Sequence, residues 1–419
     1  MIETNFKHTD IGLIPHDWEV KELEPLCSKL CVGFVGTCEP YYVSAGRGVK
    51  MVRTGDLKDS YVDLSNTKFI SYDFHRSHLK SQLKRGDILI ARHGSNGHGV
   101  IYDSDAEANS LNIVILRTES ISNKYIIYLL DSPSLRLQIE GVTAGSTQRV
   151  INTKEIAKLQ IPLPPTLSEQ EKIANALSKI DQLINDLGAL IEKKKAIKQG
   201  TMQELLTAKR RLKGCTGKWI EKTIEELGIL TGAGVDKKSS EDETPIRLVN
   251  YLDVFKRDYI FQKELDFWVT ANEGKKHQCN VLKGDIFFTP SSEMPYDIAL
   301  SALAMEDMPN VCYSYHIYRL RLNEDIDFLY RAYMFKSDSF YSQANQTCEG
   351  SGKRYVISLS KFKQMTVTYP SSKKEQRAIA NVLSSMDTEI TNLEQKRDKY
   401  IAIKQGMMQN LLTGKIRLI

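Results

Sequence analysis

The stretch EQEKIANALSKIDQL, Glu169–Leu183, is written a second time in the chain as EQRAIANVLSSMDTE, Glu375–Glu389. Aligned without a gap, residues 169–212 match residues 375–418 at a constant offset of 206 positions, and about half of the residues are identical. This offset is far longer than the 20 to 50 residues of a solenoid repeat. The repeated unit is therefore a domain followed by a helix, and the sequence predicts a chain of two halves.

Both copies carry the signals of a helix start and an amphipathic helix. Thr166 stands three residues before Glu169, and Ser372 three before Glu375, which is the spacing of a capping box. Apolar residues then follow the 4-3-4-3 spacing of a coiled-coil seam: Ile173, Leu177, Ile180, Ile184 and Leu187, and again Ile379, Leu383, Met386, Ile390 and Leu393. One such stripe can pack on its own domain, but two matching stripes favour pairing with each other. A helix from Thr166 to about Thr207 would be about 60 Å long, which suits a spacer.

Length and composition indicate a soluble globular protein. With 419 residues, 41% of them hydrophobic and 26% charged, the chain can bury two ordinary cores, and its length suggests two to four domains. No apolar run is long enough for a membrane span, and MIETNFKHTD at the N-terminus has no segment of the signal-peptide kind. We therefore expect a cytoplasmic protein that does not associate with a membrane.

The seven cysteines are odd in number and irregularly spaced. This pattern argues against both a disulfide framework and a zinc site. Only Cys27, Cys31 and Cys38 stand close together, and free thiols explain them better than metal ligation does. No bound metal is expected.

Charge is concentrated in the two repeats. They hold 16 basic and 11 acidic residues, which accounts for the whole net charge of +5. A net charge this small falls short of the strongly basic character of a simple nucleic-acid-binding protein. Charge alone therefore permits DNA binding only if Lys and Arg gather on one face of each domain.

The regions ahead of the repeats, about residues 1–160 and 213–368, have the pattern of mixed α/β domains. Strands are predicted at Asp87–Arg92, Asn112–Arg117, Asp285–Thr289 and His316–Leu322, and helices at Ser122–Ser132 and Asp325–Ser337. Both regions share an order of landmarks: a tryptophan (Trp18, Trp219), a Gly-Asp strand, a helix, a Gly-Ser loop (AGSTQRVI, EGSGKRYVI) and a Pro-containing exit. Elsewhere they diverge, so one framework carries two different surfaces.

A glycine-rich loop follows the first Gly-Asp strand. It sets five polar residues among glycines: Arg92, His93, Ser95, Asn96 and His98. Glycines let the backbone approach a DNA groove, where such side chains offer donors and acceptors to base edges. Ser291, Ser292 and Tyr296 stand in the corresponding place of the second domain. A plain surface turn explains the same residues equally well.

The shared Gly-Ser loop is followed by polar and basic residues in both domains. They are Gln148 and Arg149 in the first domain and Lys353 and Arg354 in the second. Recurrence in both domains suits contacts to phosphates, because phosphates look alike in any two half-sites. A solvated basic turn is the alternative explanation.

Three segments have parts of enzyme motifs, and none has a complete one. SSEMPYD, Ser291–Asp297, carries Glu293 and Met294 where the Asn/Asp-Pro-Pro-Tyr motif of amino-methyltransferases needs its amide or carboxylate and its first proline. No glycine-rich turn for S-adenosylmethionine lies upstream. NEGKK has a single Glu-x-Lys pair of the nuclease kind, and GSNGHG lacks the Lys-Ser/Thr of a P-loop. No catalytic residue and no cofactor are predicted for the chain itself.

The sequence resembles the specificity subunits of type I restriction–modification systems in several stretches. These are the frame IGLIPHDWEVKEL, the strand GDILIAR, the segment AGSTQRVINTKEIAKLQIPLPP and the paired motifs EQ-x-x-IA-N-x-L and KQG-x-MQ-x-LLT. The resemblance spans essentially the whole chain. It implies an α/β protein with two target-recognition domains joined by two long helices in an antiparallel coiled coil, as a pseudo-twofold internal repeat. The domains would be residues 1–160 and 213–368, and the spacer helices residues 161–212 and 369–419.

In this family each recognition domain reads one half of a bipartite site in double-stranded DNA. Two modification subunits, which bind S-adenosylmethionine and methylate adenine N6, are expected to dock around the helices, and a restriction subunit to join them. The resemblance thus implies a non-catalytic subunit that directs methylation and restriction at an asymmetric site. Two other hypotheses stay open: a self-contained DNA methyltransferase or nuclease, and a coiled-coil scaffold or phage-fibre protein that does not bind DNA.

Overall fold

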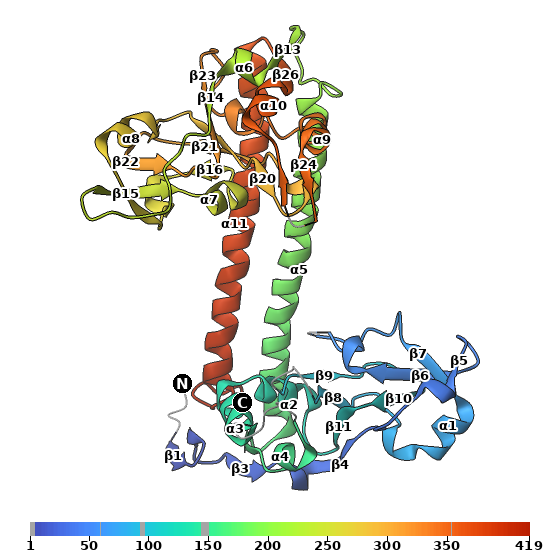
Figure 1. The fold of residues 1–419 in the computed structure, drawn as a ribbon. Coiled ribbons are helices and arrows are strands. Elements are labelled where there is room, and N and C mark those ends of the chain that lie inside the picture. Colours follow the sequence, from blue (N-terminus) through green and yellow to red (C-terminus); the bar gives the residue numbers. More distant parts are fainter. Residues whose placement is uncertain (1–4, 59, 93–96, 144–150, 353) are drawn as a thin grey trace. The chain divides into compact units, whose positions relative to one another are not determined.

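The computed structural model describes residues 5–58, 60–92, 97–143, 151–352 and 354–419 (Figure 1). The chain forms two compact units: unit 1 consists of Met1–Gly188 and Gln395–Ile419, and unit 2 of Ala189–Glu394. Each unit contains one α/β domain together with a part of each of two long helices. The fold class expected from the sequence is thereby confirmed.

The two repeats form the long helices. α5 extends over Leu167–Leu206, 40 residues, and α11 over Lys373–Leu411, 39 residues. Thr166 Oγ1 accepts the N–H of Glu169 at 3.2 Å, as an N-terminal cap does. The predicted capping box is not completed, however, because the Glu169 carboxylate accepts hydrogen bonds from Arg417 instead. A charged donor is the stronger partner for a buried carboxylate than a backbone N–H.

Ion pairs show that α5 and α11 run antiparallel within each unit. In unit 1, Glu169 pairs with Arg417 and Asp181 pairs with Lys404, so the partner's number falls as the number on α5 rises. The same holds for the two pairs of unit 2, Lys198–Asp387 and Arg211–Glu375. The antiparallel pairing predicted from the matching stripes is confirmed.

The apolar stripes serve the helix pair and the domain cores together. Ile173 and Leu177 are buried in the core of unit 1 beside Leu411 and Leu412, at the C-terminal end of α11. In unit 2, residues of both helices share one core: Met202, Leu205, Leu206, Ile379 and Leu383. The remaining predicted seam residues are buried or half-buried: Ile180, Ile184, Leu187, Met386, Ile390 and Leu393. Packing on the domain and pairing between the helices, which the sequence presented as alternatives, therefore occur at once.

Unit 1 is built on two four-stranded sheets. The first has the order β4-β11-β8-β9, formed by Cys27–Val32, Ile113–Thr118, Ile88–Ala91 and Gly99–Ile101. It packs against α2 (Asn123–Leu130), α3 (Pro133–Thr143), α4 (Thr153–Ala157) and the start of α5. The second has the order β10-β6-β7-β5, formed by Ala108–Leu111, Gly48–Arg53, Lys68–Ser71 and Tyr42–Val43, with α1 (Tyr72–Ser77) beside it. Two-stranded ladders join β1 (Phe6–Thr9) to β2 (Gly12–Pro15) and β3 (Glu19–Glu22) to β12 (Gln160–Leu163).

Unit 2 follows the same plan with additions. Its main sheet has five strands in the order β14-β23-β19-β21-β16, formed by Gly228–Thr231, Tyr318–Leu322, Ile286–Phe288, Ser301–Ala304 and Tyr259–Ile260. The second sheet, β17-β15-β22-β18, is formed by Trp268–Ala271, Thr244–Val249, Met308–Tyr313 and Asn280–Val281. The smaller sheets are β20-β25-β24 (Ser291–Ser292, Arg354–Val356, Glu349–Ser351) and β13-β26 (Trp219–Thr223, Thr366–Pro370). The helices are α6 (Ile224–Leu227), α7 (Tyr251–Lys256), α8 (Glu273–Gln278), α9 (Asp338–Thr347) and α10 (Leu359–Gln364).

The four predicted strands are confirmed as β8, β11, β19 and β23, and the first predicted helix as α2. The second predicted helix, Asp325–Ser337, is wrong, because the segment forms turns around a short 3-10 helix at Tyr330–Ala332. Tyr333, Met334 and Phe335 are consecutive and all buried. An isolated amphipathic helix would expose one of three consecutive side chains, so tertiary packing overrides the local helical pattern here.

Among the described residues, no helix is both long and apolar enough to cross a bilayer.

Candidate nucleic-acid interface

Each domain is held to the helix pair by the same tryptophan–arginine–glutamate contact. In unit 1, Arg417 donates to the buried carboxylate of Glu169 (Nε–Oε1 2.5 Å, Nη2–Oε2 2.8 Å) and lies over the ring of Trp18, 5.6 Å from its centroid. Hydrogen bonding to Glu169 raises the pKa of Arg417 above its already high value, so the guanidinium stays charged. Unit 2 repeats the contact with Arg211, Glu375 and Trp219.

A tyrosine–aspartate–lysine contact is repeated as well. In unit 1, the hydroxyl of Tyr128 donates to Asp181 Oδ2 at 2.8 Å, and Lys404 Nζ lies 2.6 Å from Asp181 Oδ1. Burial, and then the hydrogen bond to Asp181, raise the pKa of Tyr128, so its hydroxyl stays a donor at neutral pH. In unit 2 the corresponding residues are Tyr333, Asp387 and Lys198. The helix residues of both contacts occupy equivalent positions of the repeat, so the two domains are attached in the same way.

In unit 2 the structure brings predicted base-contact and phosphate-contact residues into one small sheet. β25 lies between β20 and β24, with Ser291 opposite Val356 and Ser292 opposite Tyr355. Arg354, at the start of β25, is exposed. Serine hydroxyls and an arginine that are far apart in the sequence therefore lie on neighbouring strands. Tyr296, the third predicted residue of this loop, is also exposed.

Sequence reasoning missed an aromatic and basic group beside Arg354. The rings of Tyr315 and His316 lie against each other with their centroids 3.9 Å apart and their planes tilted by 35°, and Tyr315 is exposed. Burial lowers the pKa of His316, and the nearby charges of Lys237 and Arg354 lower it further. Lys237 follows Gly234, where a Cβ would come within 2.4 Å of backbone atoms of the neighbouring segment, so only glycine permits this close approach. The glycine-rich segment ahead of Lys237 was the available sequence signal.

The corresponding loop of unit 1 has the same frame. The backbone N–H of Ile151 donates to the carbonyl of Arg92 at 2.9 Å, just as the N–H of Ile357 donates to the carbonyl of Pro290 at 2.8 Å in unit 2. In both units the segment after the Gly-Ser loop thus closes against the loop that follows the Gly-Asp strand. The correspondence between the two candidate loops, which was inferred from their order in the sequence, has a structural basis.

Arg92 and His98 already have partners within unit 1. The guanidinium of Arg92 donates to Asn112 (Nη1–Oδ1 2.8 Å) and Asn152 (Nη2–Oδ1 3.3 Å), and His98 Nδ1 lies 2.7 Å from Asp131 Oδ1. These bonds use two of the five guanidinium N–H donors of Arg92. The other predicted contact residues lie outside the described residues: His93, Ser95, Asn96, Gln148, Arg149 and Lys353. The individual DNA contacts therefore stay predictions.

Comparison with known proteins matches both halves of the chain. Residues 15–199 and 217–402 each match the sequence model of a family described as Type I restriction modification DNA specificity domain. A putative type I restriction enzyme MjaX specificity subunit of Methanocaldococcus jannaschii is 26% identical over 439 residues, which cover 99% of this chain and 97% of that protein. The EcoBI specificity subunit of Escherichia coli is 25% identical over 178 residues, 40% of this chain and 36% of that protein.

The fold is also shared with a solved structure. The crystal structure of a type I restriction–modification system S subunit from M. genitalium is similar with a TM-score of 0.54 at 16% identity, over 98% of this chain and 97% of that one. Each family match covers one α/β domain and most of the helix that follows it. The chain therefore belongs to the family of type I restriction–modification DNA specificity proteins.

Proposed function

We propose that this chain is the non-catalytic specificity subunit of a type I restriction–modification complex. Each unit reads one half of a bipartite, asymmetric site in double-stranded DNA, and partner subunits methylate adenine N6 or cleave DNA as the chain directs them. One observation carries the proposal: the same two contacts, Trp-Arg-Glu and Tyr-Asp-Lys, attach two domains whose candidate loops differ. A shared attachment with different loops is what two half-sites of different sequence require.

The chemistry of the two loops supports reading of two different half-sites. Unit 2 presents Ser291 and Ser292 next to Arg354, with the Tyr315–His316 ring pair nearby. The corresponding frame of unit 1 presents Arg92, held by two asparagines. Hydroxyl, amide and guanidinium groups are those that contact base edges and phosphates in protein–DNA complexes. Because the two sets of groups differ, the half-sites are expected to differ.

The long helices support two modification subunits as partners. Leu183, Leu190 and Ile197 recur at seven-residue intervals on α5, and all three are exposed. Ile403, which is equivalent to Ile197 in the second repeat, is exposed on α11. Apolar groups left on a surface in a regular pattern indicate a protein interface. The residues of α11 equivalent to Leu183 and Leu190 are Glu389 and Lys396, so the full apolar pattern belongs to α5. A second modification subunit is proposed because α11 carries the second copy of the repeat, with S-adenosylmethionine bound by the modification subunits. A restriction subunit would join the same complex.

The test is adenine methylation in the reconstituted complex. The chain is combined with its modification subunits, and methylated adenines are mapped on genomic DNA. One bipartite motif with two unlike halves is the expected result, and the modification subunits without the chain should leave that motif unmethylated. Methyl transfer by the purified chain alone, or the same motif without it, would contradict the proposal.

A further inference from the structure

Unit 2 has a fifth strand in its main sheet, β16, with no counterpart in the described part of unit 1. β16 lies parallel to β21 at the edge of the sheet. The backbone N–H groups of Leu303 and Met305 donate to the carbonyls of Asp258 (3.0 Å) and Ile260 (3.1 Å). This strand and the residue before it bring two side chains, those of Tyr259 and Asp258, to the long helices.

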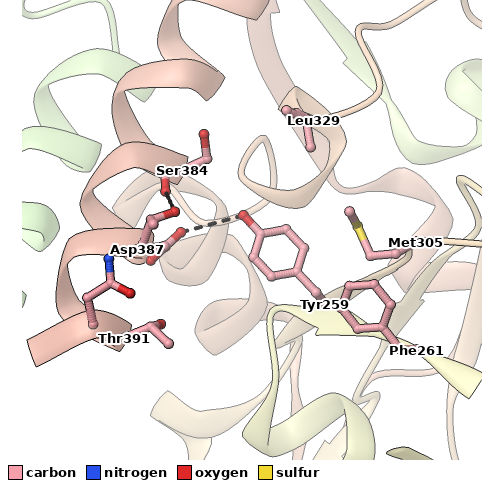
Figure 2. A pocket seen from close by; sticks show the side chains of 9 residues that line it. Tyr259, Phe261, Met305, Leu329, Ser384, Asp387 and Thr391 are labelled. Carbon is pink, nitrogen blue, oxygen red and sulfur yellow. Dashed lines mark hydrogen bonds between the residues drawn. The ribbon is translucent and has the colours of Figure 1, made fainter. Parts of the chain in front are cut away.

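Tyr259 extends the tyrosine–aspartate contact of unit 2. Tyr333 donates to Asp387 Oδ2 at 2.6 Å, and the hydroxyl of Tyr259 hydrogen-bonds to that of Tyr333 and lies 3.5 Å from the same carboxylate oxygen. Figure 2 shows Tyr259 pointing toward Asp387, beside a cavity of about 340 Å³ that Phe261 and Met305 also line. The sheet edge is thus connected to α11 through two tyrosine hydroxyls.

Asp258 connects the same strand to α5. Its carboxylate pairs with the buried Lys336 and lies 3.5 Å from Lys198 Nζ, and Lys198 pairs in turn with Asp387. Burial alone would raise the pKa of Asp258, but Lys336 and Lys198 hold it below its ordinary value, so the carboxylate is charged at neutral pH. Six side chains now form one network, which we call the unit 2 joint: Lys198, Asp258, Tyr259, Tyr333, Lys336 and Asp387.

The main sheet of unit 1 ends one strand earlier. Tyr102 makes the same pair of backbone hydrogen bonds to the Gly-Asp segment as Ala304 makes in unit 2. The neighbours of Ala304 bond to β16, whereas Ile101 and Asp103, the neighbours of Tyr102, have no strand beside them in the described part of unit 1. A cleft of about 1130 Å³ lies along this edge, lined by Ile101, Asp103, Tyr128, Asp181 and Lys404 among others.

The segment equivalent to β16 is present in unit 1 but is not attached. Ser60–Val62 follows β6 in the chain as Asp258–Ile260 follows β15. Tyr61 lines the cleft and is 56% exposed, and in the described part of unit 1 no hydrogen bond joins it to Tyr128 or to the long helices. Ser60 precedes Tyr61 as Asp258 precedes Tyr259. In the described part of unit 1, the counterpart of the unit 2 joint is therefore the three-residue contact of Tyr128, Asp181 and Lys404, beside the Trp-Arg-Glu contact that both units share.

We infer that Asp258 and Tyr259 determine how strictly the chain discriminates spacer length, the number of unread base pairs between the half-sites; this inference rests on the proposed function. One added base pair moves a half-site by about 3.4 Å and turns it by about 35°. Unless the DNA itself bends or twists, the domain follows that move by rocking on its helices. The unit 2 joint opposes rocking because it bonds the far edge of the sheet to both helices. Without it, unit 2 accepts spacers that the intact chain rejects.

The experiment compares methylation rates on duplexes whose spacer is one pair shorter than, equal to or one pair longer than the preferred one. The complete complex with its modification subunits is assayed with the native chain, with the double variant Asp258→Asn/Tyr259→Phe, and with the single variant Tyr259→Phe, which removes one hydroxyl. Tyr61→Phe is the matched control, because it removes the corresponding hydroxyl in unit 1, which among the described residues has no hydrogen bond to the long helices.

In the double variant, the rate on the altered spacers relative to the preferred spacer should rise about tenfold, which corresponds to about 1.4 kcal/mol less strain. Tyr259→Phe should give a smaller rise in the same direction. Both half-site sequences should stay unchanged, and Tyr61→Phe should match the native chain. The inference is overturned, and the proposed function is not, if Tyr259→Phe leaves the rate on altered spacers relative to the preferred spacer unchanged. The same holds if Tyr61→Phe raises that relative rate as much as Tyr259→Phe does. Failure of the native complex to methylate any bipartite site overturns the proposed function and this inference with it.

Discussion

The contact between Arg417 and Glu169 predicts a large and specific loss of stability when the arginine is removed. Glu169 is 3% exposed and Arg417 is 11% exposed, and their two hydrogen bonds are 2.5 and 2.8 Å long. Arg417→Met leaves a buried carboxylate without its counter-ion, which costs about 3–5 kcal/mol. For a unit of this size, such a loss lowers the midpoint of thermal unfolding by about 6–20 °C. Hydrogen exchange during partial unfolding should place the loss in unit 1.

The matched control is Arg210, an arginine of unit 2 with an exposed partner, which stands next to Arg211, the repeat equivalent of Arg417. Arg210 and Glu204 form an ion pair at 3.1 Å whose side chains are 54% and 49% exposed. Such a pair contributes about 0–1 kcal/mol, so Arg210→Met should lower the midpoint by less than about 4 °C. Replacing both buried partners, with Glu169→Gln and Arg417→Met together, should recover part of the loss because no buried charge is left. Equal midpoints for Arg417→Met and Arg210→Met would refute the reasoning.

Further outcomes follow from the same contacts. Exchanging residues from about 15 to 160 for the equivalent domain of another family member should change one half-site in the methylation map, whereas a change in both would contradict separate reading. Arg354→Ala should weaken binding to all duplexes and reduce the slope of log K against log salt by about 0.9; a change in preferred bases would instead indicate base contact. Inserting seven residues after both Leu187 and Leu393 keeps the seam in register and lengthens each helix by about 10 Å. The preferred spacer should therefore grow by about three base pairs, and an unchanged spacer would show that helix length does not set it. Burial would raise the pKa of Asp131, but His98 and Arg136 hold it below its ordinary value. The ionised Asp131 therefore stabilises the fold above pH about 3.9, and this stabilisation is lost as the pH falls through the lower folded-state pKa. When the urea concentration at half-unfolding is measured against pH, Asp131→Asn should weaken its decrease at acidic pH.

The helices and their pairing could be predicted because the repeat supplied two independent copies of one pattern. Ile173 and Leu177 gave the a/d spacing in the first copy, and Ile379 and Leu383 repeated it in the second. A pattern that recurs in one chain carries more information than its spacing alone, since each copy provides a partner for the other. The ion pairs could have been predicted by the same logic, because Glu169 and Arg417 are aligned with Glu375 and Arg211 in the repeat.

The candidate loops could be predicted only as positions in a frame. Arg92 has an exposed-loop pattern in the sequence, yet its guanidinium is held by Asn112 and Asn152, which come from two other segments. The Tyr315–His316 ring pair and Lys237 were missed for the same reason, since their proximity to Arg354 depends on how distant segments cross. Local patterns report helix faces and strand alternation well, but they carry no information on which distant polar groups meet.

The pairing of residues also explains why the chain contains the helix twice. Each Trp-Arg-Glu contact takes its glutamate from one repeat and its arginine from the other: Glu169 with Arg417 in unit 1, and Glu375 with Arg211 in unit 2. The cores are shared in the same way, because Leu411, near the end of the chain, is buried in unit 1. Neither domain can therefore complete its own attachment with the helix that follows it. The antiparallel pairing of the two helices completes both attachments. The same residue types serve in both because the two repeats are equivalent.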